Sequence, residues 1–286
     1  MGKNGRKSCR RWLLPAALVL AGAAWFENFT LSSSTVEVRS AALPAVFSGL
    51  RVVQISDLHG RRFDAGSRYL LALVRLQSPD IIALTGDLAD EFTDFSMLPP
   101  LLDGLTALAP TFYVTGNHEW VLSREKREAL FSMLDAAGVV RLQNEYRLLK
   151  KGQASIVLAG VDDPNGPYDQ KRPAQLVREI RQSWGRDAYI LMLSHRNDEL
   201  DLWANMGVQT VLCGHGHGGI VRLPFVGAVF GTHLDLFPDY TAGLYQKGQT
   251  SMIVSRGLGG SRKLPLRIGN RPEIVTVILK AESGKV

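Results

Sequence analysis

Short apolar runs alternate with amphipathic segments between residues 51 and 137, and this alternation restricts the fold more than any other feature of the chain. The runs have strand length and are rich in branched residues, whereas the segments between them have helical periodicity. Such an order predicts βαβ units and a largely parallel sheet. We expect strands at Arg51–Ile55, Ile81–Leu84 and Thr111–Val114, and helices at Gly66–Gln77, Phe95–Leu108 and Arg124–Ala137.

The second half of the chain differs, because most of its apolar runs are strands with few helical segments between them. We expect these strands to form a second sheet that packs on the first, with helices outside both. The expected fold class is therefore α/β, a four-layer α/β/β/α sandwich of two mixed sheets. Its strands are expected at Tyr146–Leu149, Ser155–Leu158, Tyr189–Leu193, Thr210–Leu212, Met252–Val254 and Ile274–Leu279, and its helices at Ala174–Ser183 and Asp198–Asn205.

The N-terminal segment combines positive charge with an apolar run. Five basic residues precede residue 12, and the 15 residues from Trp12 to Phe26 then carry no charge. A run of this length is shorter than the ~20 residues of a spanning helix and matches the core of a signal peptide. Positive charge on its N-terminal side predicts that the rest of the chain is extracytoplasmic, either exported or membrane-anchored. The alternatives are the cytoplasmic face of the membrane, or an apolar helix packed on the domain.

These features predict three parts of the chain. Residues 1–27 form a signal or membrane-anchor segment, and residues 28–49 form a linker with an edge strand at Val36–Arg39. Residues 50–282 form the main domain.

The net charge of +6 belongs to the N-terminal segment, since the chain after residue 12 has 28 basic and 27 acidic residues. A near-neutral domain does not indicate a nucleic-acid partner. The only cysteines are Cys9 and Cys213, which have neither zinc-motif spacing nor the pattern of a disulfide framework. We expect Cys213 to be a small buried residue.

Polar motifs with five of the six histidines directly follow the expected strands. The carboxyl ends of strands in an open α/β sheet form a ligand crevice, so these side chains are expected to converge there. Imidazole, carboxylate and amide oxygen together suit Zn, Mn or Fe ions. Each motif alone is common by chance, but their combination indicates a two-metal hydrolase. The motifs are Asp57-Leu58-His59, Gly86-Asp87, Gly116-Asn117-His118-Glu119, Ser194-His195 and Gly214-His215-Gly216-His217.

In this order, the motifs resemble the calcineurin-like metallophosphoesterase superfamily, whose pattern is Asp-x-His, Gly-Asp, Gly-Asn-His-Asp/Glu, His and Gly-His-x-His. The resemblance covers residues from about Leu50 to Leu279. Ser255-Arg256-Gly257-Leu258-Gly259 and Arg271-Pro272-Glu273-Ile274 look like the YkuE/YaeI-type branch of small bacterial phosphodiesterases. The chain departs from that branch at Gly216 and Ile220, where Thr and Gln are common, and at Arg196-Asn197, where Asn-Pro is common.

The resemblance implies a dinuclear centre of Mn, Zn or Fe. It implies that Asp57, His59, Asp87 and His217 hold the first metal, and that Asp87, Asn117, His195 and His215 hold the second. Asp87 would bridge the two ions, and a hydroxide held between them would attack the phosphate. His118 is expected to contact the phosphate and protonate the leaving oxygen.

Other residues have two open interpretations each. Glu119 is expected either to support the site or to belong to a turn, and Asp162-Asp163 either to line the cleft or to form a turn. Arg61 and Arg62 either meet a substrate phosphate or are solvated loop charges, and His233 is expected to be a surface or structural residue. The apolar residues of the loop after the last motif either contact a lipid surface or are buried in the second sheet. These residues are Phe225, Phe230, Leu234, Leu236 and Phe237.

The expected substrate is a lipid-, nucleotide- or envelope-linked phosphodiester or pyrophosphate. The alternatives are a UDP-2,3-diacylglucosamine pyrophosphate hydrolase, a nuclease of the same superfamily and a non-catalytic scaffold on the same fold. The N-terminal segment predicts membrane association, and no obligate protein partner is expected.

Overall fold

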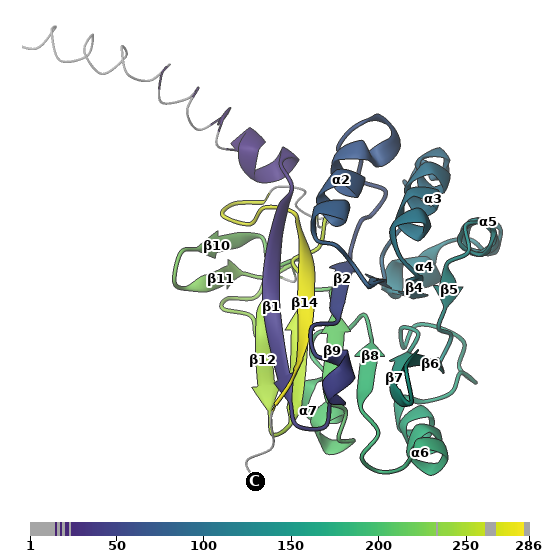
Figure 1. The fold of residues 1–286 in the computed structure, drawn as a ribbon. Helices are drawn as coiled ribbons and strands as arrows, with labels where there is room; N and C mark the ends of the chain where they lie inside the picture. Colours follow the sequence, from purple (N-terminus) through teal and green to yellow (C-terminus); the bar gives the residue numbers. More distant parts are fainter. Residues whose placement is uncertain are drawn as a thin grey trace, which may run out of the picture.

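The computed structural model describes residues 15, 18, 21–22, 24–232, 234–260 and 267–282. The expectations for residues 1–14, with Cys9, and for His233 fall outside the described residues. The chain forms two six-stranded sheets that pack on each other, and a two-stranded hairpin projects beside them (Figure 1).

The first sheet contains the three strands expected in the first half of the chain. β2, β3, β4 and β5 are parallel to one another, and β14 pairs antiparallel with β2. The strand order is β1 (Ser32–Ser40), β14 (Glu273–Ala281), β2 (Arg51–Ile55), β3 (Ile81–Thr85), β4 (Thr111–Val114) and β5 (Val140–Arg141). The expected strand at Val36–Arg39 is thus an edge strand, as β1.

The second sheet also has a parallel centre with one antiparallel strand at each edge. Its order is β12 (Gly243–Lys247), β13 (Thr250–Val254), β9 (Thr210–Cys213), β8 (Ile190–Leu193), β7 (Ala154–Gly160) and β6 (Glu145–Lys151). Cys213 is fully buried in β9, as expected.

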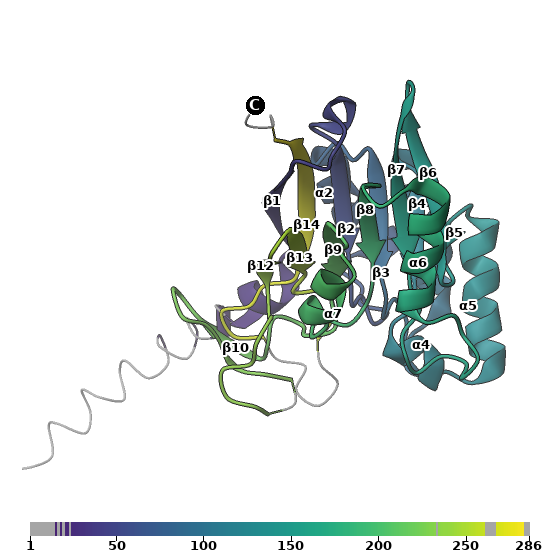
Figure 2. The ribbon, with the colours of Figure 1, turned by 90° about the horizontal axis from the view of Figure 1, so that it is seen from below.

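Helices cover the outer face of each sheet (Figures 1 and 2). Those of the first sheet are α2 (Arg68–Leu76), α3 (Leu98–Leu108) and α5 (Arg124–Ala136), and those of the second are α6 (Pro173–Trp184) and α7 (Leu200–Asn205). The short helix α4 (Asn117–Val121) directly follows β4. The four layers confirm the expected α/β/β/α sandwich.

Strand alternation builds these layers, because successive side chains point to opposite faces of a sheet. Val53 and Ile55 of β2 pack with the helices α2 and α3. Val52, the residue before Val53, joins the core between the sheets, which also contains Leu191 of β8 and Leu212 of β9. The parallel strands are therefore buried on both faces, and their carboxyl ends reach one edge of the sandwich.

One expectation about the sheets is wrong. Ile274–Leu279 was expected in the second sheet, but β14 lies in the first sheet between β1 and β2. In β14, Thr276 pairs with Val53 of β2, and Val277 pairs with Val36 of β1. Pairing of the last strand with the first two depends on contacts between distant parts of the chain, which local periodicity does not report.

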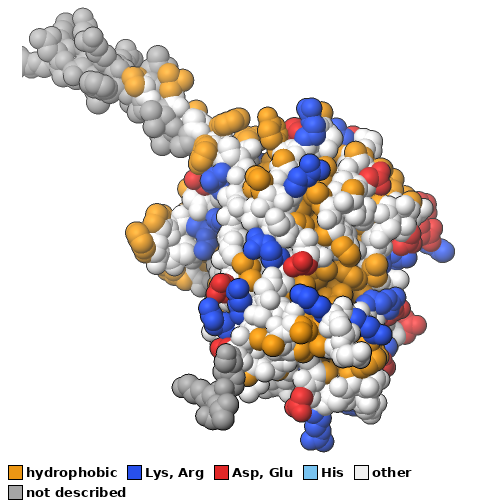
Figure 3. Space-filling view, viewed as in Figure 1, with side chains coloured by type: hydrophobic (Ala, Val, Ile, Leu, Met, Phe, Trp, Pro, Cys, Tyr) orange, Lys and Arg blue, Asp and Glu red, His pale blue; other side chains and the backbone are white. Residues whose placement is uncertain are grey.

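A hairpin of β10 (Val221–Leu223) and β11 (Gly227–Phe230) leaves the second sheet, and the turn between its strands is apolar. Phe225 and Val226 in that turn are exposed, and hydrophobic side chains mark its end in Figure 3. Leu234, Leu236 and Phe237 are also exposed, so the loop is not buried in the second sheet.

The chain before β1 is helical at residues 24–29. None of the helices in the part of the chain that the structure describes has the length and apolar character needed to span a bilayer.

Candidate metal centre

The predicted ligands lie at the carboxyl ends of five parallel strands, and the two sheets bring these ends together. Asp57 follows β2, Asp87 follows β3 and Asn117 follows β4 in the first sheet. His195 follows β8 in the second sheet, and His215 and His217 follow β9. The structure places the carboxylates and imidazoles of this set in two groups, each with its ligand atoms within 4.8 Å of one another: Asp57, His59, Asp87 and His217, and Asp87, His195 and His215.

The first group is buried. His59 Nε2 lies 3.6 Å from Asp87 Oδ2, and His217 Nε2 lies 3.8 Å from Asp57 Oδ1. The His59 and His217 rings stack with centroids 5.0 Å apart. Two carboxylates and two imidazoles thus point to one position, which is the donor set of a first-row divalent ion.

The second group shares Asp87. His195 Nε2 lies 3.2 Å from Asp87 Oδ2, 3.1 Å from Asn117 Oδ1 and 3.2 Å from His215 Nδ1. Asn117, which the resemblance assigns to the second metal, therefore lies beside this group. Because Asp87 Oδ2 faces histidines of both groups, its carboxylate occupies the bridging position between them.

The backbone at these residues is unusual. Asp57, His59, Asp87, His215 and His217 all have φ between 48° and 66°. This left-handed region is uncommon for residues other than glycine and costs of order 1 kcal/mol or more for each. Five predicted ligands thus share this backbone conformation, and strain gathered in one cluster points to a functional site.

The pKa shifts of the cluster and its buried nitrogen atoms without hydrogen-bond partners indicate that it fits cations. Burial raises the pKa of Asp57. Burial also opposes the charged form of His195, but the Asp87 carboxylate raises its pKa to about 10. His59 Nε2 and His217 Nδ1 are buried without a hydrogen-bond partner. Divalent ions bound here would balance the charge of the two buried carboxylates and would accept the lone pair of His59 Nε2.

Partners behind the ligands orient the imidazoles. His195 Nδ1 lies 2.8 Å from the Thr85 carbonyl and donates to it, so Nε2 is the nitrogen that would give up its proton and present a lone pair to a bound cation. His59 Nδ1 lies 3.5 Å from Asp90 Oδ2. Burial opposes ionisation of Asp90, but His59 and neighbouring donors lower its pKa to about 2.

Sequence reasoning missed Asp90. Its signal was its spacing from Asp87 in Gly86-Asp87-Leu88-Ala89-Asp90, where the intervening turn returns the chain toward His59. Asp90 also accepts the backbone N–H of Phe92 and the hydroxyl of Thr93.

Glu119 supports the site, which resolves the two interpretations given above. Its carboxylate is fully buried and accepts four backbone N–H groups. Three come from Asp87, Leu88 and Ala89, and the fourth comes from Gly116. Glu119 therefore joins the loop after β3 to the loop after β4.

Residues 255–259, one of the segments that carry the family resemblance, form a loop that packs against the first motif. Gly257 has φ of 67°, and a Cβ there would lie 2.7 Å from the Cβ of Asp57. Leu258 N–H donates to the Ser56 carbonyl. Glycine at position 257 thus permits this loop to pack directly behind the first ligand.

His118 belongs to neither ligand group. Its backbone N–H donates to Asp87 Oδ1 at 2.8 Å, and its ring lies edge-on to His59 with centroids 4.7 Å apart. Its side chain is half-buried, and burial lowers the pKa of His118. The ring lies beside the ligands without belonging to either group, so it can exchange a proton with a bound substrate.

The arginines after the first motif are used elsewhere. Arg61 donates to the Asn28 carbonyl and lies over the rings of Phe29 and Phe63, while Arg62 pairs with Asp94. In these contacts, neither arginine meets a predicted metal ligand.

The acidic pair after β7 divides between two roles. Asp162 accepts the Thr115 backbone N–H and hydroxyl, so it is structural. Asp163 accepts the Asn165 N–H in a turn and also binds Arg196, which borders the ligand groups.

Fold and site together define a class, an α/β/β/α hydrolase built to hold two metal ions. Residues 50–219 match the calcineurin-like phosphoesterase family. The chain belongs to this family and is a metal-dependent phosphoesterase.

Full-length relatives agree with this match. The chain is 28% identical over 267 residues to the metallophosphoesterase YkuE of Bacillus subtilis (strain 168), covering 91% of this chain and 89% of YkuE. It is 31% identical over 233 residues to the phosphodiesterase YaeI of Escherichia coli (strain K12), covering 80% and 82%. The solved structure of the protein TT1561 of Thermus thermophilus overlaps with a TM-score of 0.47 at 14% identity, covering 73% of this chain and 90% of that one.

Proposed function

We propose that the protein is a phosphodiesterase that uses a dinuclear centre of Mn, Zn or Fe. The observation that carries this proposal is the position of Asp87 Oδ2, which lies 3.6 Å from His59 Nε2 and 3.2 Å from His195 Nε2. One carboxylate between two histidine-rich groups is the arrangement of a two-metal site. The relative YaeI, which is named a phosphodiesterase, supports the choice of a diester.

The chain's own residues have separate roles in this proposal. Asp57, His59, Asp87 and His217 would hold one ion, and Asp87, Asn117, His195 and His215 the other. When bound, the two cations neutralise phosphoryl oxygens and lower the pKa of water toward neutrality. His118 in its imidazolium form would give its proton to the leaving oxygen, since its half-buried ring lies beside His59 at the edge of the site.

Hydrolysis of chromogenic esters tests the proposal. The purified protein, loaded with Mn, Zn or Fe in turn, should hydrolyse bis-p-nitrophenyl phosphate faster than the monoester p-nitrophenyl phosphate. Chelation should abolish the activity, and the added metal should restore it. Preference for the monoester would contradict the diester assignment, and no hydrolysis with any metal would support a scaffold instead.

For the physiological substrate, we propose a lipid-, nucleotide- or envelope-linked phosphodiester or pyrophosphate. The exposed apolar side chains of Phe225, Leu236 and Phe237 favour a lipid-linked molecule over a free nucleotide. A panel of lipid phosphodiesters, nucleotide diesters and pyrophosphates, including UDP-2,3-diacylglucosamine, distinguishes these classes. Hydrolysis confined to soluble nucleotide diesters would contradict the lipid preference.

We also propose an extracytoplasmic position at the membrane surface. Its support is the basic and then apolar order of residues 3–26 and the exposure of Trp25, Phe26 and Phe29 beside β1. Protease treatment of intact spheroplasts should degrade the domain. Protection from the protease would place the domain on the cytoplasmic side.

A further inference from the structure

A guanidinium borders the metal-ligand cluster and is held there by a buried carboxylate. Arg196 follows the ligand His195 at the end of β8, and Asp163 follows β7 in the neighbouring loop. Arg196 Nε donates to Asp163 Oδ2 at 2.6 Å, and Arg196 Nη2 donates to Asp163 Oδ1 at 3.0 Å. The Asp163 side chain has no exposed surface, whereas the Arg196 side chain is 24% exposed.

This pairing determines which part of the arginine is available. Two parallel bonds to one carboxylate orient a planar guanidinium strongly. Asp163 itself is restrained, since its carboxylate also accepts the Asn165 N–H and its backbone N–H donates to Thr115. The third nitrogen of Arg196, Nη1, therefore points in a defined direction, away from Asp163.

Arg196 Nη1 lies 3.1 Å from Nε2 of His215. The other nitrogen of that ring, Nδ1, faces His195 Nε2 within the second ligand group. A neutral imidazole has one nitrogen with a lone pair and one with a hydrogen. When Nδ1 of His215 presents its lone pair to a cation, Nε2 carries the hydrogen and no longer accepts from Arg196.

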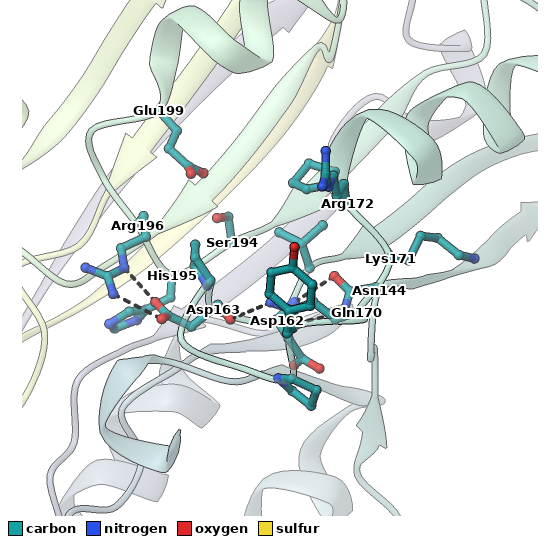
Figure 4. Close-up of a pocket in the computed structure, with 15 residues that line it drawn as sticks. Asn144, Asp162, Asp163, Gln170, Lys171, Arg172, Ser194, His195, Arg196 and Glu199 are labelled. Carbon is teal, nitrogen blue, oxygen red and sulfur yellow. Dashed lines mark hydrogen bonds and ion pairs between the residues drawn. The ribbon is translucent and has the colours of Figure 1, made fainter. Parts of the chain in front are cut away.

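In that state, Nη1 of Arg196 needs another acceptor beside the second ligand group. The Arg196 side chain is 24% exposed, and on the side of Asp163 it also borders a pocket of about 240 Å³ that Asn144, Gln170 and Glu199 help to line (Figure 4). Because Nη1 lies beside the ring of His215, a molecule bound at the second ligand group would lie within reach of Arg196. A phosphoryl oxygen is the acceptor that suits a guanidinium.

We propose that Arg196 is a substrate-binding residue that donates from Nη1 to a phosphoryl oxygen, and that Asp163 is the residue that positions it. The proposal deepens the phosphodiesterase function and rests on it. In this role, the positively charged side chain of Arg196 contacts the substrate on the side of His215.

Binding of inorganic phosphate to the purified protein, with and without Mn, tests this role by calorimetry. Arg196→Gln should weaken phosphate binding to the Mn-loaded protein about 10- to 100-fold, because it removes a charge-assisted bond. Arg196→Lys should lose less, since it keeps the charge but lacks the planar fork. The metal content should stay at the wild-type value in both variants.

Asp163→Asn should raise KM for the chromogenic diester more than it lowers kcat, because the guanidinium remains but is less well oriented. A matched control is Arg141→Gln, since Arg141 also forms two bonds to one carboxylate, that of Asp135, and has a 20% exposed side chain. This control should leave phosphate binding unchanged.

Phosphate affinity of Arg196→Gln within about twofold of the wild type would overturn the proposal and leave Arg196 as a structural link between two loops. If Arg196→Gln does not fold, Arg196→Lys carries the test, and wild-type phosphate affinity in that variant would overturn the proposal. Absence of hydrolysis with phosphate binding that still depends on Arg196 would contradict only the proposed function. If the protein hydrolyses the diester and the Arg196 substitutions do not change phosphate affinity, only this inference is contradicted.

Discussion

Glu119 Oε2 accepts the backbone N–H of Asp87 at 3.0 Å, so the predicted bridging ligand is held by a carboxylate from the helix α4. The same oxygen accepts Gly116 N–H at 2.7 Å, and Oε1 accepts Leu88 N–H at 2.7 Å. A glutamine at position 119 would have one acceptor oxygen, and its NH₂ group would face backbone N–H groups that it cannot accept.

We therefore expect Glu119→Gln to destabilise the fold by about 2–4 kcal/mol, since at least one buried donor loses its acceptor. Urea denaturation of the metal-free protein measures this change. The exposed Glu128→Gln is the control, and equal stability of both variants would mean that the carboxylate does not hold the two loops together.

Asp87→Asn should deplete the bound metal, because it reduces the charge of the only carboxylate placed in both ligand groups. Metal analysis after gel filtration should show the loss of at least one ion per chain. Asp103→Asn, at an exposed position of α3, should keep the wild-type metal content. Full metal occupancy with full activity in Asp87→Asn would remove the bridging assignment.

His118→Ala should lower kcat about 10²- to 10⁴-fold, because it removes a proton donor. Both ions should remain bound, since His118 lies outside the two ligand groups. Steady-state kinetics together with metal analysis of one preparation separates the two effects. Loss of an ion would show that His118 is a ligand instead.

Asp90→Asn should weaken metal binding at the position next to His59 by about 10- to 100-fold, because a carboxylate partner orients a ligating imidazole and raises its basicity. The other position should change less, since His195 is oriented by the Thr85 carbonyl. Competition with a chelator measures both affinities. An equal loss at both positions would indicate a general disturbance of the loop.

Glu199→Gln should change the pH dependence of stability. Burial first, and then the neighbouring Asp198, raises the pKa of Glu199 from 4.5 to about 7. The folded protein thus disfavours the charged form, and the wild type loses stability as the pH rises from 4.5 through about 7. The variant is neutral throughout, so its advantage should grow across this window and then level off.

That advantage should be on the order of 1 kcal/mol, because the side chain is only partly buried. Denaturation of the metal-free proteins at about pH 5 and about pH 8 measures it. The exposed Glu145→Gln should show no such trend. A constant difference between Glu199→Gln and the wild type at both pH values would contradict the assignment.

The periodicity of the chain predicted the strands well, because a strand's apolar pattern is local. The bounds of β2 at Arg51–Ile55 and of β4 at Thr111–Val114 agree with the prediction. The strands β5, β10, β11 and β12 were not predicted, since they are only partly buried and their apolar pattern is correspondingly weak. The sheet to which β14 belongs was also beyond prediction, because it depends on pairing with β1 and β2.

The same division holds at the site. The sequence by itself determined the set of candidate ligands and the strand ends that carry them, because each motif is local and its chemistry is set by residue type. Tertiary structure alone decided that Glu119 holds Asp87, that Asp90 faces His59 and that Asp163 directs Arg196. Each of these contacts joins loops that follow neighbouring strands of one sheet, so its geometry exists only after those strands have paired. The complete ligand set also needs the two sheets to pack, because Asp57, Asp87 and Asn117 follow strands of the first sheet and His195 and His215 follow strands of the second.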